Sequence, residues 1–231
     1  MTDKSSRRFA AASGFLFLAL FVAHRIVQGP GPLQGRGASL DPSSAAIAAY
    51  FTEHRTAVLV AAYLNELGIL FLILFVGGLA GAVRRSGDQV MADVVLGGGL
   101  LFAAMGLVTS AAQTALAWVA GEGDPNAVRG LFDLQAAVPV TIAIAAFVGA
   151  TALAVLRTRI LSRWLGVVGL AATLVFLAGA AGQSGIATSG FFAPKGSAAL
   201  VGAALFVAWV LAVCVALSWR CSKPDRVDSA V

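Results

Sequence analysis

The stretch Thr56–Val83 decides the fold, because it reads TAVLVAAYLNELGILFLILFVGGLAGAV and Glu66 is its only charged residue. A helix needs about 20 mostly apolar residues to cross a bilayer, and this run exceeds that length. The chain has five further runs of the same kind: Phe9–Gln28, Val90–Ala120, Ala127–Leu156, Trp164–Gly182 and Ser197–Trp219. Strands of a membrane β-barrel would instead alternate apolar and polar residues in segments of about 10 residues. The sequence therefore predicts six transmembrane helices.

The composition of the whole chain supports the same class of protein. Of its 231 residues, 59% are hydrophobic and 12% are charged, whereas a soluble domain has about 25% charged residues. This excludes a soluble enzyme, a disordered protein and a nucleic-acid-binding protein, despite the net charge of +5. Two cysteines are too few for a disulfide scaffold. We expect residues 1–231 to form a single all-α integral membrane domain, a polytopic helix bundle in contact with membrane lipids.

Basic residues divide unequally between the two sides of the membrane that these spans define. The side that holds the N-terminus has 11 of the 16 basic residues: Lys4, Arg7, Arg8, Arg84, Arg85, Arg157, Arg159, Arg163, Arg220, Lys223 and Arg226. Because cytoplasmic loops are enriched in Lys and Arg, both termini are predicted to be cytoplasmic. The preference for Arg over Lys indicates a bacterium with GC-rich DNA, and therefore an inner-membrane location. Trp118, Trp164 and Trp219 lie near predicted span ends, as interfacial anchors do, whereas Trp209 is expected to pack inside.

The longest exterior segment, residues 29–55, is predicted to contain a short helix near residues 42–54. Asp41 is a suitable N-cap, and Pro42 suits the first helical position. Ile47 and Phe51 then share one face at helical spacing, which is typical of a helix that lies at the membrane interface. The pair Asp124–Pro125 repeats this cap arrangement before the fourth span.

Ionisable residues inside the predicted spans are the main candidates for function, because each costs about 2.5–3.5 kcal/mol to insert. Glu66 follows Asn65 about ten residues into its span, which places it roughly 15 Å deep at 1.5 Å per residue. It is either a group that responds to protons or cations, or a neutral acid that hydrogen-bonds between helices. Arg129 and Asp133 are four residues apart on one helix face and are expected to form a local ion pair.

Other polar side chains also occur at or near the spans. Gln113 is expected to hydrogen-bond between helices. His24 ends the first span and His54 precedes the second, and each is followed by an arginine, Arg25 or Arg55. The histidines are expected to lie at the interface on the outer side. The more specific alternative is that they bind a metal ion or a haem there. The sequence has no HExxH motif and no Cys/His cluster, so neither a metal nor another cofactor is predicted.

These polar residues share one property, which is that they map to the outer half or the midplane of the bundle. They are His24, Arg25, His54, Arg55, Asn65, Glu66, Gln113, Arg129 and Asp133. Such an arrangement predicts an outward-facing polar pocket that binds or transports a small molecule or a lipid. Two alternatives remain: a non-catalytic accessory subunit that packs against a membrane protein partner, and an intramembrane metal or haem protein. No Walker loop, nucleophile elbow or catalytic triad is present, so no catalytic residue is predicted.

The turn Arg157–Gly166, which reads RTRILSRWLG, is similar to a known family. It resembles an uncharacterised family of bacterial, largely actinobacterial, multi-pass membrane proteins with a Leu-Pro-Arg-Trp-Leu-Gly-like motif before a late span. Ser162 stands where that motif has its proline. The residues Ile47–Phe51, followed by His54 and Arg55, are also similar to the family. The resemblance implies a multi-pass membrane fold and carries over no functional residue.

Overall fold

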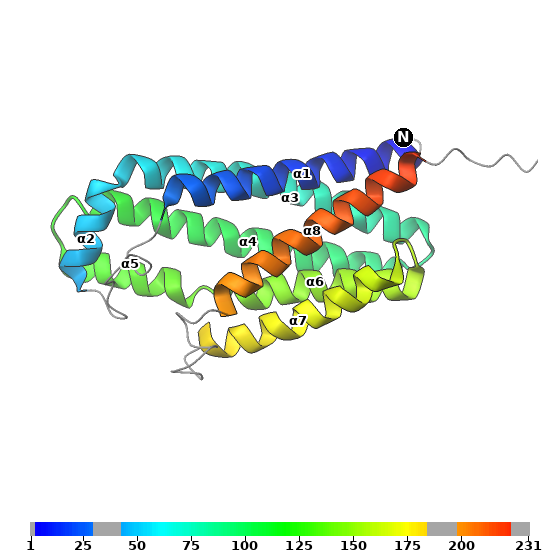
Figure 1. Ribbon diagram of the computed structural model, residues 1–231. Helices are drawn as coiled ribbons and strands as arrows, with labels where there is room; N and C mark the ends of the chain where they lie inside the picture. The colour runs from blue at the N-terminus through cyan, green and yellow to red at the C-terminus, as the bar shows by residue number, and fades with distance from the viewer. Residues whose placement is uncertain (1–2, 30–42, 184–197, 223–231) are drawn as a thin grey trace, which may run out of the picture.

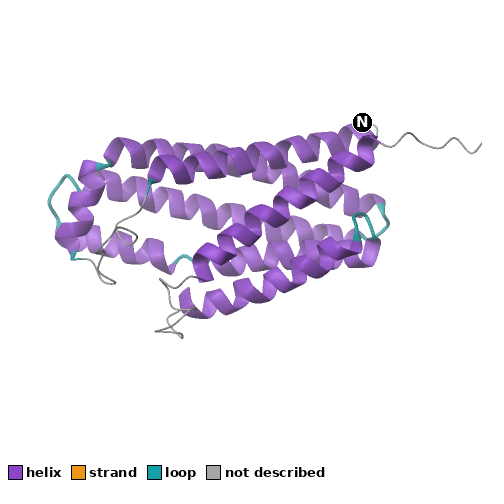
Figure 2. Cartoon of the chain, viewed as in Figure 1, coloured by secondary structure: helices purple, strands orange, loops and turns teal. Residues whose placement is uncertain are grey.

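The computed structural model describes residues 3–29, 43–183 and 198–222, and the regular elements in these ranges are all helices (Figure 2). They are α1 (Asp3–Gln28), α2 (Ser44–Glu53), α3 (Arg55–Arg85), α4 (Gln89–Val119), α5 (Pro125–Ala137), α6 (Val140–Thr158), α7 (Arg163–Gln183) and α8 (Ala198–Ser222). Six spans are long and apolar enough to cross a membrane, with α5 and α6 together forming the fourth. The predicted all-α bundle of six transmembrane helices is therefore confirmed, and the chain is an integral membrane protein.

The six spans are arranged in a ring. Helix α1 packs on α3, α3 on α4, α4 on α6, α6 on α7 and α7 on α8, and α8 returns to α1 (Figure 1). Every span contributes at least one aromatic side chain to the middle of this ring. We call this set the aromatic plug, and its members are Phe17, Phe21, Phe75, Phe102, Phe147, Phe176, Phe206 and Trp209. Neighbouring rings of the plug have centroids 5.4–6.5 Å apart, so the plug fills the ring at its centre.

Glycines allow the spans to approach closely in the half of the bundle that holds the chain's N-terminus. A Cβ atom added to Gly98 of α4 would lie 3.1 Å from both the carbonyl oxygen of Ala146 and the Cα of Phe147 in α6. A Cβ atom added to Gly78 of α3 would lie 2.5 Å from the Cβ and 3.2 Å from the Cα of Ala10 in α1. Small residues at such crossings let spanning helices pack backbone against backbone, and the compact bundle follows from them.

The fourth span, predicted at Ala127–Leu156 and observed over Pro125–Thr158, contains a break between two helices. Helix α5 ends before Val138, whose ψ of 121° is extended, and α6 begins after Pro139. Proline lacks an N–H for the helical ladder, and its ring disfavours helical backbone in the preceding residue. The N–H of Val140 instead donates to the carbonyl of Val138 at 2.8 Å. Pro139 was visible in the sequence, but the apolar run around it concealed its effect.

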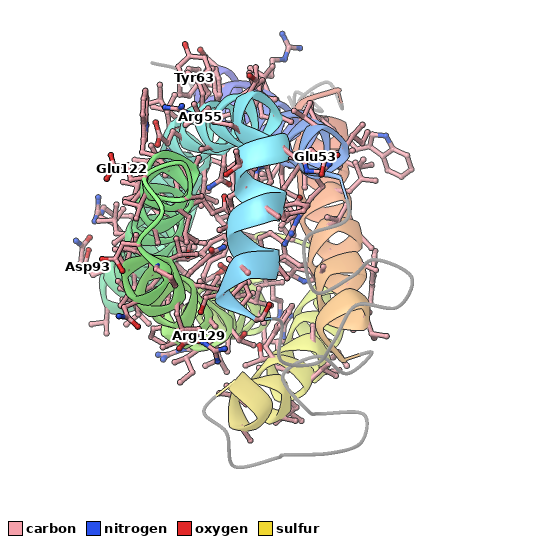
Figure 3. All side chains as sticks on the ribbon, turned by 90° about the vertical axis from the view of Figure 1, so that its left-hand side faces the viewer. Glu53, Arg55, Tyr63, Asp93, Glu122 and Arg129 are labelled. Atoms are coloured by element: carbon pink, nitrogen blue, oxygen red, sulfur yellow. The ribbon has the colours of Figure 1, made fainter. Side chains whose placement is uncertain are left out.

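Helix α2 crosses one end of the bundle, opposite the end where α1 begins (Figures 1 and 3). Its buried residues Ile47 and Phe51 pack in a cluster with Val58 of α3 and Leu116 of α4. The predicted short helix near residues 42–54 is therefore present, with Ser43 as its N-cap. The predicted cap residues 41 and 42 lie outside the described residues. We call this side of the molecule the α2 end.

The opposite side, which we call the basic end, gathers the arginines that flank the spans. They are Arg7, Arg8, Arg84, Arg85, Arg157, Arg159 and Arg163. Asp88 lies among them, where it caps α4 through the N–H of Met91 at 3.0 Å and pairs with Arg157 at 3.2 Å. Trp164 and Trp219 are exposed near helix ends, whereas Trp209 is buried, as predicted.

Candidate functional site

A cavity of about 190 Å³ lies between the aromatic plug and the α2 end. Phe17, Phe21 and Phe102 of the plug form its apolar floor. Ile69, Leu72, Gly106 and Val140 add to the apolar lining. Six polar side chains also line the cavity, which we call the polar pocket: His24, Arg25, Asn65, Thr109, Gln113 and Gln135. At roughly 30 Å³ per molecule, it has room for about six waters. The structure thus brings together four of the predicted site residues: His24, Arg25, Asn65 and Gln113.

Helix α1 supplies the basic side of the pocket from its last two turns. His24 is buried, and its Nδ1–H donates to the carbonyl oxygen of Ala61 at 2.8 Å. Because a carbonyl can only accept, this bond assigns the proton to Nδ1. Arg25 is exposed at the mouth, with its guanidinium carbon 5.7 Å from the ring centroid of Phe21. No acidic residue is among those that line the pocket in the described part of the chain.

Helices α3 and α4 supply the amides. The Nδ2 of Asn65 donates to the Oγ of Ser110 at 2.7 Å, which joins the two helices. Gln113 was expected to make such a bond, but it is 6% exposed and its amide has no hydrogen bond within the described residues. The Oε1 of Gln135 is likewise buried with no partner there. An unsatisfied buried polar group costs about 1–3 kcal/mol, so water or a ligand is expected to bond these amides.

The break in the fourth span borders the pocket. Gln135 from α5 and Val140 from the start of α6 both line the cavity. No side chain caps the N-terminus of α6, which begins after Pro139. The first N–H groups of a helix and its dipole make this end electropositive. The pocket therefore combines an arginine, amide donors and a helix N-terminus.

Glu66 is not among the residues that line the polar pocket, whereas its neighbour Asn65 is. Consecutive helical residues point about 100° apart, so Asn65 faces α4 while Glu66 faces outward. Its carboxylate has no hydrogen bond or ion pair among the described residues. Exposed Tyr63 and Leu70 lie on the same face, and Figure 3 shows Tyr63 pointing away from the bundle. Glu66 is thus a carboxyl group on the membrane-facing surface of α3.

The remaining predicted residues lie around the α2 end without lining the pocket. Arg129 and Asp133 form the expected ion pair, with Nε and Oδ2 2.8 Å apart and both side chains exposed. His54 stacks on Tyr50 at a centroid distance of 4.6 Å. Arg55 stacks over a tryptophan ring, with its guanidinium carbon 4.0 Å from the centroid. Arg55 and Arg129 lie at opposite edges of the bundle in Figure 3, so they do not form one site.

Two pocket residues were missed by sequence reasoning, Thr109 and Gln135. The sequence could have indicated Gln135 as a pocket residue, because it is a polar residue one turn before the proline that interrupts its span. Thr109 donates to the carbonyl of Met105 at 2.9 Å, as Thr commonly does within a helix. Within the described ranges, no three His, Cys, Asp or Glu side chains are grouped as metal ligands.

Comparisons with known proteins found no matching family model, no matching curated protein and no matching solved structure. The resemblance to the actinobacterial membrane protein family therefore stays a prediction. The chemistry of the polar pocket is the basis on which a function can be assigned to the chain.

Proposed function

We propose that this integral membrane protein binds a small anion, such as a carboxylate or phosphate, in the polar pocket. The observation that carries this proposal is the set of donors around the cavity without an acidic residue to neutralise them. Arg25 supplies a full positive charge, and charge-assisted hydrogen bonds from arginine suit carboxylate and phosphate oxygens. The partnerless amide of Gln113 would add a donor, and the dipole of α6 would add a positive field from the other side.

The size of the pocket supports a small ligand rather than a drug-sized one. Its volume of about 190 Å³ is below the ~300–1,000 Å³ typical of drug-sized pockets. Nε2 of His24 can only accept, because the ring proton is on Nδ1, which donates to Ala61. It would therefore contact a protonated ligand oxygen, such as the hydroxyl of hydrogen phosphate. A bound carboxylate or phosphate would then bond groups on α1 and α4 and lie near the N-terminus of α6.

Transport of this anion is the activity that we propose for the site. Interrupted spans that border a central cavity are typical of secondary transporters, in which half-helix N-termini face anionic substrate groups. The break at Val138–Pro139 has that position relative to the pocket. The charge bias of the sequence supports a cytoplasmic location of the basic end, so the pocket would open to the outside.

The test is a thermal-shift measurement on detergent-purified protein with sodium phosphate, acetate or succinate at constant ionic strength. A ligand at ten times its Kd stabilises by about 1.4 kcal/mol, or ~3–6 °C for a chain of this size. We expect Arg25→Gln and Gln113→Leu to abolish the shift. Arg55→Gln removes the same charge outside the pocket and should retain it, as should Glu66→Gln. An anion-induced shift that survives in Arg25→Gln would refute the proposal.

Uptake into sealed vesicles then separates a transporter from a binding protein. Protein reconstituted in liposomes is given the radiolabelled anion that produced the largest shift. A transporter accumulates it at a rate that Arg25→Gln abolishes and Arg55→Gln preserves. Binding without uptake above protein-free liposomes would restrict the proposal to an anion-binding membrane protein.

A second candidate function, an accessory subunit of a membrane complex, is favoured by Glu66. A carboxyl group that faces lipid costs about 2.5–3.5 kcal/mol at mid-span unless a partner bonds it. A photo-crosslinking residue in place of Glu66 would then join this chain to one defined partner. The same residue in place of Leu174, which is 68% exposed on α7, is the control. No discrete product from position 66 would refute the accessory role.

A further inference from the structure

A second cavity of about 910 Å³ opens on the outside of the bundle at the basic end. It lies between the first turns of α1, the first turn of α7 and the second half of α8, and we call it the α8 groove. It shares no lining residue with the polar pocket, so a ligand in the groove is independent of the proposed function. Its volume is within the ~300–1,000 Å³ range of ligand pockets.

The groove arises from the oblique path of α8 and from its small side chains. The indole N–H of Trp209 donates to the carbonyl of Leu165 at 3.1 Å and so fixes α8 to the start of α7. Beyond this point α8 runs toward α1 and away from α7 (Figure 1). Ala208, Ala212 and Ala216 line the cavity at a spacing of four residues, which puts them on one helix face. Their methyl groups leave the space between the helices unfilled.

One end of the groove is polar, and the rest is apolar. Arg7 of α1 and Ser162, directly before α7, line the end near the arginines. Ser162 precedes the first N–H groups of α7, whose dipole is positive there. Trp164 and Trp219 line the same region and are 56% and 74% exposed. Exposed tryptophans mark the level of lipid headgroups, so this polar end lies where phosphates of the surrounding bilayer lie.

We propose that the α8 groove is a binding site for one anionic phospholipid of the leaflet at the basic end. The lipid phosphate accepts hydrogen bonds from the Arg7 guanidinium and the Ser162 hydroxyl. An acyl chain lies over the alanine face of α8. Charge complementarity selects an anionic headgroup, as in other basic pockets between spanning helices. The apolar wall faces the membrane, which excludes a water-soluble anion as the occupant.

The experiment is native mass spectrometry of the full-length protein, released from detergent after incubation with phosphatidylglycerol or with phosphatidylcholine of the same acyl chains. The wild type is expected to retain one phosphatidylglycerol in preference to phosphatidylcholine. Arg7→Gln should reduce the retained fraction about tenfold, in line with the loss of a charge-assisted bond. Arg8→Gln is the matched control, because Arg8 is an adjacent exposed arginine that does not line the groove. If the two variants lost the retained lipid equally, the lipid would be attracted to the whole basic end, and the proposed site would be overturned.

A second pair of variants tests the groove without touching a charge. Ala208→Phe places a ring in the cavity, whereas Ala204→Phe places it one turn earlier on α8, outside the cavity. Both alanines are exposed, so both variants are expected to fold, and elution on size exclusion checks this. Ala208→Phe should lose the lipid and Ala204→Phe should keep it. Retention by Ala208→Phe, or another occupant such as the chain's own C-terminal segment or a copurifying protein in place of lipid, would overturn the proposal.

Discussion

Replacing Gly98 with alanine should destabilise the bundle, whereas the same change at the neighbouring Gly97 should stabilise it. A Cβ at position 98 would lie 3.1 Å from the Ala146 carbonyl oxygen, 3.1 Å from the Phe147 Cα and 3.2 Å from the Ala146 carbonyl carbon. All three are backbone atoms of α6, so no side chain can rotate away and the two helices must separate. A Cβ at position 97 has no heavy atom within 4 Å.

The magnitudes follow from these two environments. Forcing an extra methyl group into a packed contact typically costs about 1–3 kcal/mol, which is a fall of ~2–12 °C in melting temperature for a chain of this size. Alanine is favoured over glycine inside a helix by about 0.5–1 kcal/mol, so Gly97→Ala should gain ~1–4 °C. The loss at position 98 also reaches the aromatic plug, because Phe147 stacks on Phe102, one turn after Gly98, at a centroid distance of 6.4 Å.

The assay is the apparent melting temperature of each purified variant in one detergent at one scan rate, since unfolding of membrane proteins in detergent is commonly irreversible. The difference between the two variants is the informative quantity, because both carry the same chemical change one residue apart. If Gly98→Ala matched or exceeded Gly97→Ala in stability, the close approach of α4 and α6 would be refuted. The role of Gly98 in bringing α4 and α6 together in the ring of spans would also be refuted.

Three further predictions use the same melting assay. Trp209→Phe loses the bond to the Leu165 carbonyl and replaces a buried indole with a smaller ring, which together should cost about 1–3 kcal/mol. Burial raises the pKa of Tyr50 above its ordinary 10.0, so this residue stabilises the fold below pH 10 and the benefit is lost as the pH rises through the folded value. Ionisation of Tyr50 also removes the hydrogen bond from its hydroxyl to the carbonyl of Gln28. Above pH 10, the melting temperature of the wild type should therefore fall more steeply than that of Tyr50→Phe. Asp88→Ala loses both the α4 cap and a partly exposed ion pair and should cost about 0.5–2 kcal/mol, whereas Asp88→Asn keeps the cap and should cost less.

Features set by short-range sequence pattern were predictable. The long apolar runs predicted the spans, and the four-residue spacing of Arg129 and Asp133 predicted their ion pair. Asp124 likewise caps α5 as expected, since its carboxylate accepts from the N–H of Asn126 at 2.9 Å. Each of these depends on neighbours within one or two helical turns.

Features that depend on the rotation of a helix about its axis were not predictable. In an apolar span, the sequence does not say which face meets lipid and which meets other helices, because both faces are hydrophobic. Asn65 and Glu66 were therefore placed together, although one faces α4 and the other faces the membrane. The order of helices in the ring, which makes Gln113 and Arg25 line one cavity, depends on contacts between residues far apart in the chain.

The two halves of the bundle differ in a way that bears on the proposed transport. In the basic half, the spans are held by backbone contacts at Gly78 and Gly98 and sealed by the aromatic plug. In the half at the α2 end, the fourth span is broken and buried amides such as that of Gln113 have no partner within the described residues. Elements that carry unsatisfied polar groups and breaks in their hydrogen bonding are the ones that open at low cost in free energy. Movement during a transport cycle should therefore begin with α5 and α2, and passage toward the basic end would require α4 and α6 to part at Gly98.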